Sequence, residues 1–277
     1  MKNVKQWVFI LIALVMIVAA VLLIVWSKNG DGNGEKITEK TEVFTGELKE
    51  LIFQAGACEV EMKEGPAGQI TVQYENIELK SSESGFSDGV LTIKTKDPKK
   101  VNFFGLGFSV DSEDAKITVT IPADTVLEKA TLEFGAAEVT AERISAEELT
   151  IAVGAGEFTA EQLVAETSAR LTVGAGAFYA EEVHLTNAEL ECGVGEMELS
   201  GVIYGDATVD CGVGALELTL DGQTKEEFRG ELSCGLGKLC FGDITINGSG
   251  EETYGSSEAE NRMNVKCGIG EVNVRFE

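Results

Sequence analysis

A short phrase built around a pair of glycines recurs seven times in the C-terminal half of the chain. It reads apolar-x-apolar-Gly-x-Gly-x-apolar-x-apolar, as in IAVGAGEFTA from Ile151 and LECGVGEMEL from Leu190, and alanine replaces the second glycine in the first copy. Self-similarity at a period of about 20 residues is typical of repeat architectures, in which each copy packs on its neighbours. The first glycines of the copies are Gly135, Gly154, Gly174, Gly193, Gly212, Gly235 and Gly268.

The apolar residues within one copy predict short strands joined by tight corners. Leu171, Val173 and Ala175 occupy alternate positions, and a period of two is typical of a strand. The alternation slips by one residue across Gly176, so the chain must turn a corner there to keep its apolar face inward. We expect glycine at such corners because it accepts positive φ angles and close backbone approach. The corner glycines are Gly135, Gly154, Gly156, Gly174, Gly176, Gly193, Gly195, Gly212, Gly214, Gly235, Gly237, Gly268 and Gly270.

The length of the repeat predicts a parallel β-solenoid. A period of about 19 residues is too short for a strand followed by a crossover helix, so consecutive coils should stack strand on strand, about 4.8 Å apart. We therefore expect an all-β, parallel β-solenoid (β-helix-like) with coils of about 19–20 residues, preceded by one transmembrane α-helix. Equivalent residues would form apolar rows in chain order, one of them being Leu132, Ile151, Leu171, Leu190, Val209, Leu232 and Val265.

The regularity of the repeat divides the solenoid into two parts. Residues 132–277 are expected to form the regular Gly-x-Gly coils. The mostly polar segment 243–264 is predicted to be a loop insertion, with a short strand at Ile244 to Ile246. Residues 42–131 are less regular, and we expect them to form irregular coils that cap the N-terminal end, because an open end would leave an exposed strand edge.

The N-terminal segment predicts a membrane anchor. Trp7 to Trp26 is a run of 20 residues without charge, which is long enough to cross a bilayer, and a tryptophan stands at each end. No small-x-small cleavage site follows, which favours an uncleaved signal anchor over a signal peptide. Two preceding lysines favour a cytoplasmic location for residues 1–6. Residues 27–41 would then be a flexible linker to a domain outside the membrane.

The strongly acidic composition limits the partners of the chain. Its formal net charge is −25, and such a surface repels nucleic acid and anionic headgroups. We expect a solvated acidic exterior, contact with the membrane through residues 7–26, and no nucleic-acid partner. An envelope protein or a surface ligand is the expected partner class.

Four of the six cysteines fall at one position of the repeat, directly before the first glycine, where the first copy has Phe134. Because this position points inward, we expect a row of buried thiols; disulfides between neighbouring coils are the alternative. Thiols on separate coils cannot converge on one tetrahedral zinc ion. Cys240 falls at an outward position and is the expected exposed thiol. The buried row comprises Cys192, Cys211, Cys234 and Cys267.

The other candidate groups do not form a catalytic set. His184 is the only histidine and is expected to point outward. The Gly-x-Gly phrase lacks the following helix of a dinucleotide-binding motif. An outward carboxylate recurs after the second glycine, and it forms either a solvated face or a calcium-binding row. We expect no catalytic, cofactor-binding or metal-binding residues, and no cofactor. The carboxylate row comprises Glu138, Glu157, Glu196 and Glu271.

The repeat resembles that of the bacterial putative-adhesin domain-of-unknown-function family, which includes the LiaG-like envelope proteins. The matching segments are ITVTIPAD from Ile117, LEFGAAEV from Leu132, and the VGAGEF and CGVGEMEL copies that follow. They extend the resemblance over residues 42–277. The resemblance implies a β-solenoid exposed at the cell envelope, often with an N-terminal membrane anchor. It supplies no catalytic residues and does not account for the cysteine row.

These observations predict a non-enzymatic, membrane-anchored extracytoplasmic protein that acts as an adhesin or as an interaction scaffold of the cell envelope. One alternative is an ectodomain that regulates a membrane partner in envelope-stress sensing, with VNFFGLGFSV from Val101 as its contact, although this stretch would also suit a cap for the solenoid core. A polysaccharide-active β-helix enzyme is a further alternative. Few basic residues and few outward aromatic residues, of which Tyr179 is the clearest, disfavour that enzyme.

Overall fold

The structure is a computed structural model that describes residues 36–78, 84–95, 101–103, 106–108 and 115–277. The predicted transmembrane segment 7–26 and the predicted cytoplasmic residues 1–6 lie outside these ranges. The predicted linker 27–41 is wrong at its end, because residues 36–41 belong to strand β1 (Lys36–Thr45). Within the described ranges, no helix combines the length and the apolar character needed to cross a bilayer.

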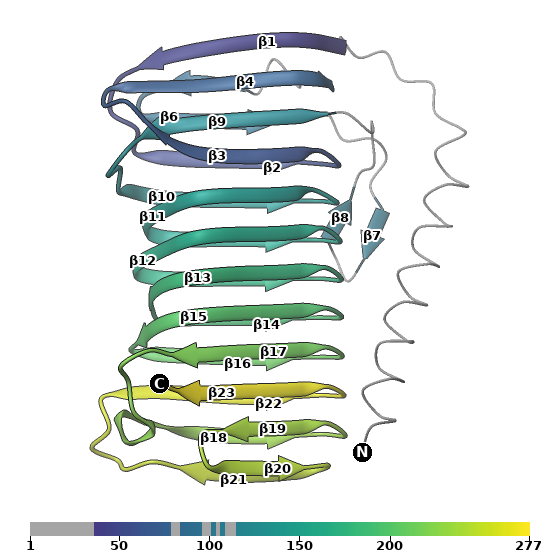
Figure 1. The fold of residues 1–277 in the computed structure, drawn as a ribbon, viewed down its shortest axis with the longest axis vertical. Helices are drawn as coiled ribbons and strands as arrows, with labels where there is room; N and C mark the ends of the chain where they lie inside the picture. The colour runs from purple at the N-terminus through teal and green to yellow at the C-terminus, as the bar shows by residue number, and fades with distance from the viewer. Residues whose placement is uncertain (1–35, 79–83, 96–100, 104–105, 109–114) are drawn as a thin grey trace. The chain divides into compact units, whose positions relative to one another are not determined.

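The described strands of the main sheet form a solenoid in which each coil places one strand on each of two faces (Figure 1). The chain runs along the second face, passes a Gly-x-Gly turn and returns along the first face. Neighbouring coils pair in parallel, so the predicted all-β solenoid is confirmed. In spatial order the first face contains β1, β4 (Gln69–Glu78), β9 (Lys116–Pro122), β3 (Glu59–Gly65), β11 (Glu138–Val153), β12 (Glu157–Val173), β13 (Ala177–Thr186), β15 (Glu196–Tyr204), β17 (Ala215–Leu220), β23 (Glu271–Phe276), β19 (Lys238–Phe241) and β20 (Ile244–Asn247). The second face contains β5 (Gly85–Ser87), β6 (Val90–Lys94), β2 (Glu50–Ala55), β10 (Leu127–Phe134), the C-terminal parts of β11 and β12, β14 (Ala188–Cys192), β16 (Asp206–Cys211), β22 (Asn261–Cys267), β18 (Phe228–Cys234) and β21 (Gly250–Tyr254).

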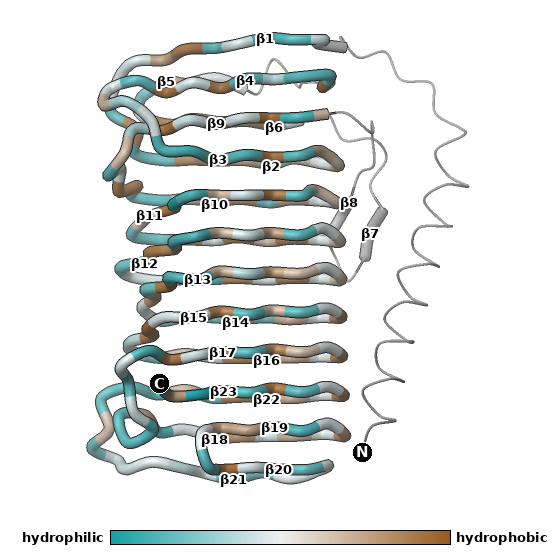
Figure 2. Tube along the Cα trace, viewed as in Figure 1, coloured by the Kyte–Doolittle hydropathy of each residue, from teal (hydrophilic) through white to brown (hydrophobic). Residues whose placement is uncertain are grey.

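Inward side chains of the two faces form one continuous core. Along each strand buried and outward residues alternate, and the hydropathy of the trace alternates with them (Figure 2). The rings of Phe158 and Phe178 stack across neighbouring coils with their centroids 4.7 Å apart, and Phe134 contacts Phe158 from the other face. Because equivalent residues lie in register, each coil buries its apolar side chains against the coils above and below it. The inward row of the first face is Val60, Val139, Phe158, Phe178, Met197, Leu216, Val272 and Leu239.

Close approach of neighbouring backbones explains the corner glycines. None of the thirteen has a positive φ angle, so that part of the expectation is wrong. A Cβ atom at Gly195 would instead lie 2.1 Å from the carbonyl oxygen of Gly176 in the neighbouring coil. The turns stack as tightly as the strands do, because backbone hydrogen bonds continue through them. One example is the 2.7 Å bond from the Val213 N–H to the Gly193 carbonyl.

The coils do not stack entirely in chain order. The C-terminal pair β22–β23 lies between the coil β16–β17 and the coil β18–β19, which precedes it in the chain. The expected row is therefore wrong at its end: Val265 lies between Val209 and Leu232. The N-terminal end mirrors this exchange, because β2–β3 lies between β6–β9 and β10–β11. At both ends of the solenoid, therefore, the coil that comes first or last in the chain is not the outermost coil. The coils β2–β3 and β22–β23 each lie between two other coils.

Antiparallel strands cover both ends of the solenoid. The predicted short strand at Ile244 to Ile246 is confirmed as part of β20, which covers β19. The prediction of a loop over the rest of 243–264 is wrong, because β21 covers β18 and the segment ends within β22. At the other end, β4 pairs antiparallel with β9, and β1 with β4. Strands β7 (Val101–Phe103) and β8 (Leu106–Phe108) form a separate two-stranded sheet. The rest of the aromatic stretch from Val101 lies outside the described residues.

Candidate functional site

The four repeat cysteines lie on four successive coils, directly before the Gly-x-Gly turns. Register places Cys192 beside Cys211, Cys211 beside Cys267, and Cys267 beside Cys234. The spatial order thus differs from the chain order, because β22 lies inside the stack. All four side chains are buried and unpaired. Their position between apolar residues of the second face gives them the role of small buried apolar side chains.

The surroundings of Cys211 and Cys267 disfavour the thiolate form, whereas the hydrogen bond with Cys211 lowers the pKa of Cys192. Burial raises the pKa of Cys267 to about 12, and the same cause raises the pKa of Cys58 to about 12. The Cys267 thiol donates to the Lys238 carbonyl at 3.6 Å, and the Cys192 thiol to the Ala215 carbonyl at 3.8 Å. Since the thiolate is the reactive form, Cys211 and Cys267 are chemically quiet in the folded state, and burial shields Cys192 and Cys234 from reagents in the solvent.

Cys240 differs from the repeat cysteines in its exposure. It points outward on the first face in the same row as Asn273, and it is partly exposed. Its sulfur lies 3.8 Å from the Thr245 hydroxyl of β20. We expect maleimide to label one of the six thiols of the folded chain, at Cys240, and all six after denaturation. Mass spectrometry of the labelled peptides measures this, and Cys240→Ser should abolish native labelling. Rapid labelling of Cys211 or Cys267 in the folded chain would contradict it.

The carboxylate row after the second glycine follows the register of the first face. Glu138 and Glu157 lie side by side, whereas Glu271 lies beside Lys238 and pairs with it at 2.9 Å. Tyr179 donates a hydrogen bond to Glu196 at 3.2 Å. Among the residues that the structure describes, no group of three or more His, Cys, Asp or Glu side chains is arranged to hold a metal ion.

Burial, together with the carboxylates of Glu196 and its neighbours, raises the pKa of Tyr179 to about 12. The folded chain therefore keeps this proton where the unfolded chain loses it, at about pH 10. Its contribution to the free energy of unfolding should be complete below pH 10 and should fall as the pH rises towards 12. The difference in tyrosinate absorbance between the unchanged chain and Tyr179→Phe should have its midpoint near pH 12. A midpoint near pH 10 would show that neither burial nor the carboxylates act on this phenol.

The remaining predicted group, His184, is exposed on β13. Its ring lies 5.4 Å from the ring of Tyr204, which is also exposed. This contact is an aromatic pair on the surface, and no carboxylate hydrogen-bonded to the imidazole is part of it. The pair therefore gives no sign of general base chemistry.

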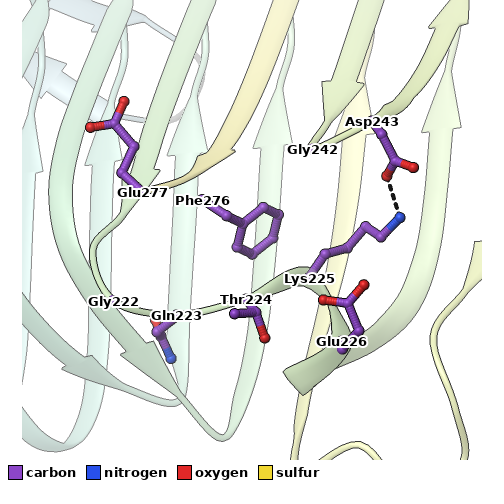
Figure 3. A pocket seen from close by; sticks show the side chains of 9 residues that line it. All are labelled: Gly222, Gln223, Thr224, Lys225, Glu226, Gly242, Asp243, Phe276 and Glu277. Carbon is purple, nitrogen blue, oxygen red and sulfur yellow. Dashed lines mark hydrogen bonds and ion pairs between the residues drawn. The ribbon is translucent and has the colours of Figure 1, made fainter.

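A shallow hollow lies beside the turn that follows β17 (Figure 3). Lys225 and Asp243 form an ion pair across its edge, and Phe276 lies at its wall. Gln223 is buried beneath and exchanges two hydrogen bonds with the backbone of Ile203, at 2.9 and 3.0 Å. Its polar groups are thus satisfied by the fold and do not point to a ligand.

The middle residues of the Gly-x-Gly turns form a further surface feature, which the predictions above do not include. Ile269 and Leu236 are exposed, whereas Val194 and Val213 are half-buried. Each middle residue donates its N–H to the first glycine of the neighbouring coil, so these side chains stack in one row along the edge. Four coils carry large apolar residues, whereas the preceding coils carry alanine. A comparison of the x positions alone would have found this change. We call the four large residues the turn row: Val194, Val213, Ile269 and Leu236, in spatial order.

Three of the solved structures that are similar to this chain have low sequence identities and low TM-scores. A "putative adhesin" from Bacteroides fragilis has 16% identity and a TM-score of 0.39, over 88% of this chain and 100% of that one. A "putative lipid binding protein" from Parabacteroides distasonis has 14% identity and a TM-score of 0.40, over 87% and 98%. A "putative cell adhesion protein" from Clostridium sporogenes has 13% identity and a TM-score of 0.32, over 86% and 100%. These likenesses are too weak to bear on function.

The family relationship rests on sequence. A comparison with curated proteins found no match. The sequence profile of the Toastrack DUF4097 family matches residues 48–275, which span the solenoid from β2 to the last strand. The predicted resemblance to a domain-of-unknown-function family with adhesin-like members is confirmed. Because the match covers most of the chain, this protein belongs to the Toastrack DUF4097 family.

Proposed function

We propose that this protein is a non-enzymatic interaction scaffold of the cell envelope, acting as an adhesin or as a docking platform. In this proposal residues 7–26 anchor it in the membrane and the solenoid lies outside. The observation that carries the proposal is the pair of continuous faces, on which outward side chains repeat in register from coil to coil. Such a surface offers an extended partner side chains at a regular spacing, and several weak contacts add up to stable binding.

The chemistry of the first face indicates the kind of partner. Glu138 and Glu157 lie in register on neighbouring strands, and Glu198 lies further along the same face. Within the described part of the chain, no ion pair reaches these three carboxylates. A partner with basic or hydrogen-bond-donating groups, either an envelope protein or a surface ligand, would complement them.

The location of the solenoid can be tested through Cys240. If the domain lies outside the membrane, a membrane-impermeant maleimide should label Cys240 as completely in intact cells as in lysed cells. Cys240→Ser is the control for labelling elsewhere, and removal of residues 1–26 should release the protein from the membrane fraction. Labelling that requires lysis would overturn the extracytoplasmic location.

The scaffold role can be tested through the carboxylates. Crosslinking of intact cells followed by mass spectrometry should recover a partner attached to the first face. Glu138→Gln together with Glu157→Gln should lower that recovery about tenfold, as expected for residues at the centre of a contact. Glu226→Gln, an exposed carboxylate at the hollow, is the matched control. Unchanged partner recovery in the double variant, together with unchanged surface attachment after deletion of the whole protein, would refute the scaffold role.

A further inference from the structure

The turn row leaves large apolar side chains in solvent on adjacent coils. Leu236 is 76% exposed and Ile269 is 55% exposed, and their coils lie side by side at the end of the row. On the same coils, Cys234 and Cys267 fill the inward position directly before the turn. Leu236 and Ile269 are therefore not part of the core. Exposed apolar residues that are contiguous, rather than scattered, mark a contact surface.

Charged residues flank the turn row on both faces. On the first face the residue after the second glycine is Glu196 on the coil of Val194 and Lys238 on the coil of Leu236. On the second face the residue two before the first glycine is Asp210 on the coil of Val213 and Lys266 on the coil of Ile269. Each coil of one half of the turn row therefore has a flanking carboxylate, and each coil of the other half has a flanking lysine, beside which Glu271 also lies.

We propose that the turn row is a homodimer interface, on which a second copy of this chain docks antiparallel. A two-fold axis across the middle of the row would place Val194 opposite the partner's Leu236 and Val213 opposite the partner's Ile269. The same axis brings Glu196 to the partner's Lys238 and Asp210 to the partner's Lys266. Each pair occurs twice, as a self-complementary interface requires.

Charge also selects the direction of the pairing. The remaining flanking residues, Ala215 with Glu271 and Glu191 with Ser233, place a carboxylate opposite an uncharged residue in the antiparallel arrangement, so they neither attract nor repel by charge. In a parallel arrangement each coil would face its own copy, and Glu191 would meet the partner's Glu196. The same arrangement would bring Glu271 to the partner's Lys266, so its two repulsive contacts are offset by two attractive ones. The antiparallel arrangement gains four attractive pairs and no repulsive one among these residues, so charge favours it.

The interface is short, which predicts a weak dimer. The turn row spans three coil spacings, about 14 Å at roughly 4.8 Å each. Lys238 also holds Glu271 of its own chain at 2.9 Å and would share its charge between two carboxylates. Exposed ion pairs contribute little each, so here they set the register while the apolar contacts supply most of the affinity. The proposal does not depend on the adhesin role, because dimerisation can be measured without any other partner.

Cysteine crosslinking of the full chain in membranes tests the arrangement. In a Cys240→Ser background, differently tagged copies carrying Val194→Cys and Leu236→Cys should crosslink under copper-phenanthroline oxidation. Two copies that both carry Leu236→Cys should crosslink about tenfold less, because the antiparallel pairing separates them by about three coil spacings. Equal crosslinking of both combinations, or none in either, would overturn the proposal.

A charge exchange provides a second test that is independent of engineered cysteines. Asp210→Lys or Lys266→Asp alone should lower the dimer fraction of the full chain, measured by chemical crosslinking with an amine-independent photoreactive probe. The double variant should restore it, because the exchanged pair is again complementary. Val126→Ser, at an exposed valine outside the turns, is the control, whereas Leu236→Ser with Ile269→Ser should abolish the dimer. Failure of the double variant to recover, with folding intact by circular dichroism, would exclude the proposed register.

Discussion

Gly176→Ala should destabilise the solenoid severely, whereas Gly135→Ala should leave it almost unchanged. A Cβ atom at Gly176 would lie 1.9 Å from the carbonyl oxygen of Gly156 and 2.9 Å from its carbonyl carbon and its nitrogen. These are backbone atoms of the neighbouring coil, so no side-chain rotation can relieve the contact. Forcing the two coils apart should cost about 3 kcal/mol or more, the upper range for overpacking. Because each coil is stabilised by its neighbours, the damage should extend to both sides of the turn.

Gly135 provides the control, because it is a corner glycine with more space, although it is the first glycine of its turn and Gly176 is the second. The nearest atoms to its Cβ would be the Cα and the carbonyl oxygen of Gly56, both at 3.4 Å, and its φ angle is not positive. There the loss of backbone freedom in the unfolded chain should offset the contact, and the change in stability should stay within about 1 kcal/mol. Urea denaturation of both variants, followed by circular dichroism, measures the difference. Equal stabilities would show that the corners accept a Cβ by local movement.

The alternation of apolar residues was sufficient to predict the coils, because burial acts on every second residue in the same way throughout the stack. It was not sufficient to predict their order. Leu232 and Val265 are both aliphatic and both precede a Cys-Gly-x-Gly turn, so either fits beside Val209. The order is decided instead by the long connection between β19 and β22, which carries the cap.

The sequence of the cap contains a turn signal, but the polar composition of the segment 243–264 favoured the prediction of a loop. Gly242 and Asp243 form the two-residue loop that joins β19 to β20, Gly242 has a φ of +56°, and a two-residue Gly-Asp loop between strands is a hairpin signal. Strand β20 alternates between half-buried and exposed residues, so the cap lacks the fully apolar face that makes a strand evident. Composition therefore suggested a loop where hydrogen bonds to the last coil impose strands.

Of the candidate site, only the buried row of cysteines could be predicted from the sequence. The inward position of the cysteines followed from the alignment with Phe134, because the core demands apolar side chains at that position. The turn row did not follow, since the core places no demand on the middle residue of a turn. Its significance depends on which coils are neighbours and therefore on the exchanged order of the last two coils.

Val272→Asp should test that order, because it places an unpaired carboxylate inside the stack. Val272 is fully buried between Leu216 on one side and Leu239 on the other. Burying a charge without a partner should cost about 4 kcal/mol or more, among the largest effects of a single substitution. Val43→Asp, at a valine that is 55% exposed, is the matched control and should have little effect.

Hydrogen exchange of the Val272→Asp chain distinguishes the two orders of stacking. If the coils followed chain order, the C-terminal coil would fray alone, and residues 228–241 would keep their protection on the coil formed by 206–220. In the structure β18 and β19 reach that coil only through β22 and β23, so their amides should lose protection together with residues 261–276. In the unchanged chain, β22 and β23 should exchange more slowly than the cap strands β20 and β21, although they lie at the C-terminus. Retained protection over 228–241 in the variant would mean that this coil stacks directly on 206–220, and that the inserted terminal coil does not hold the end of the solenoid together.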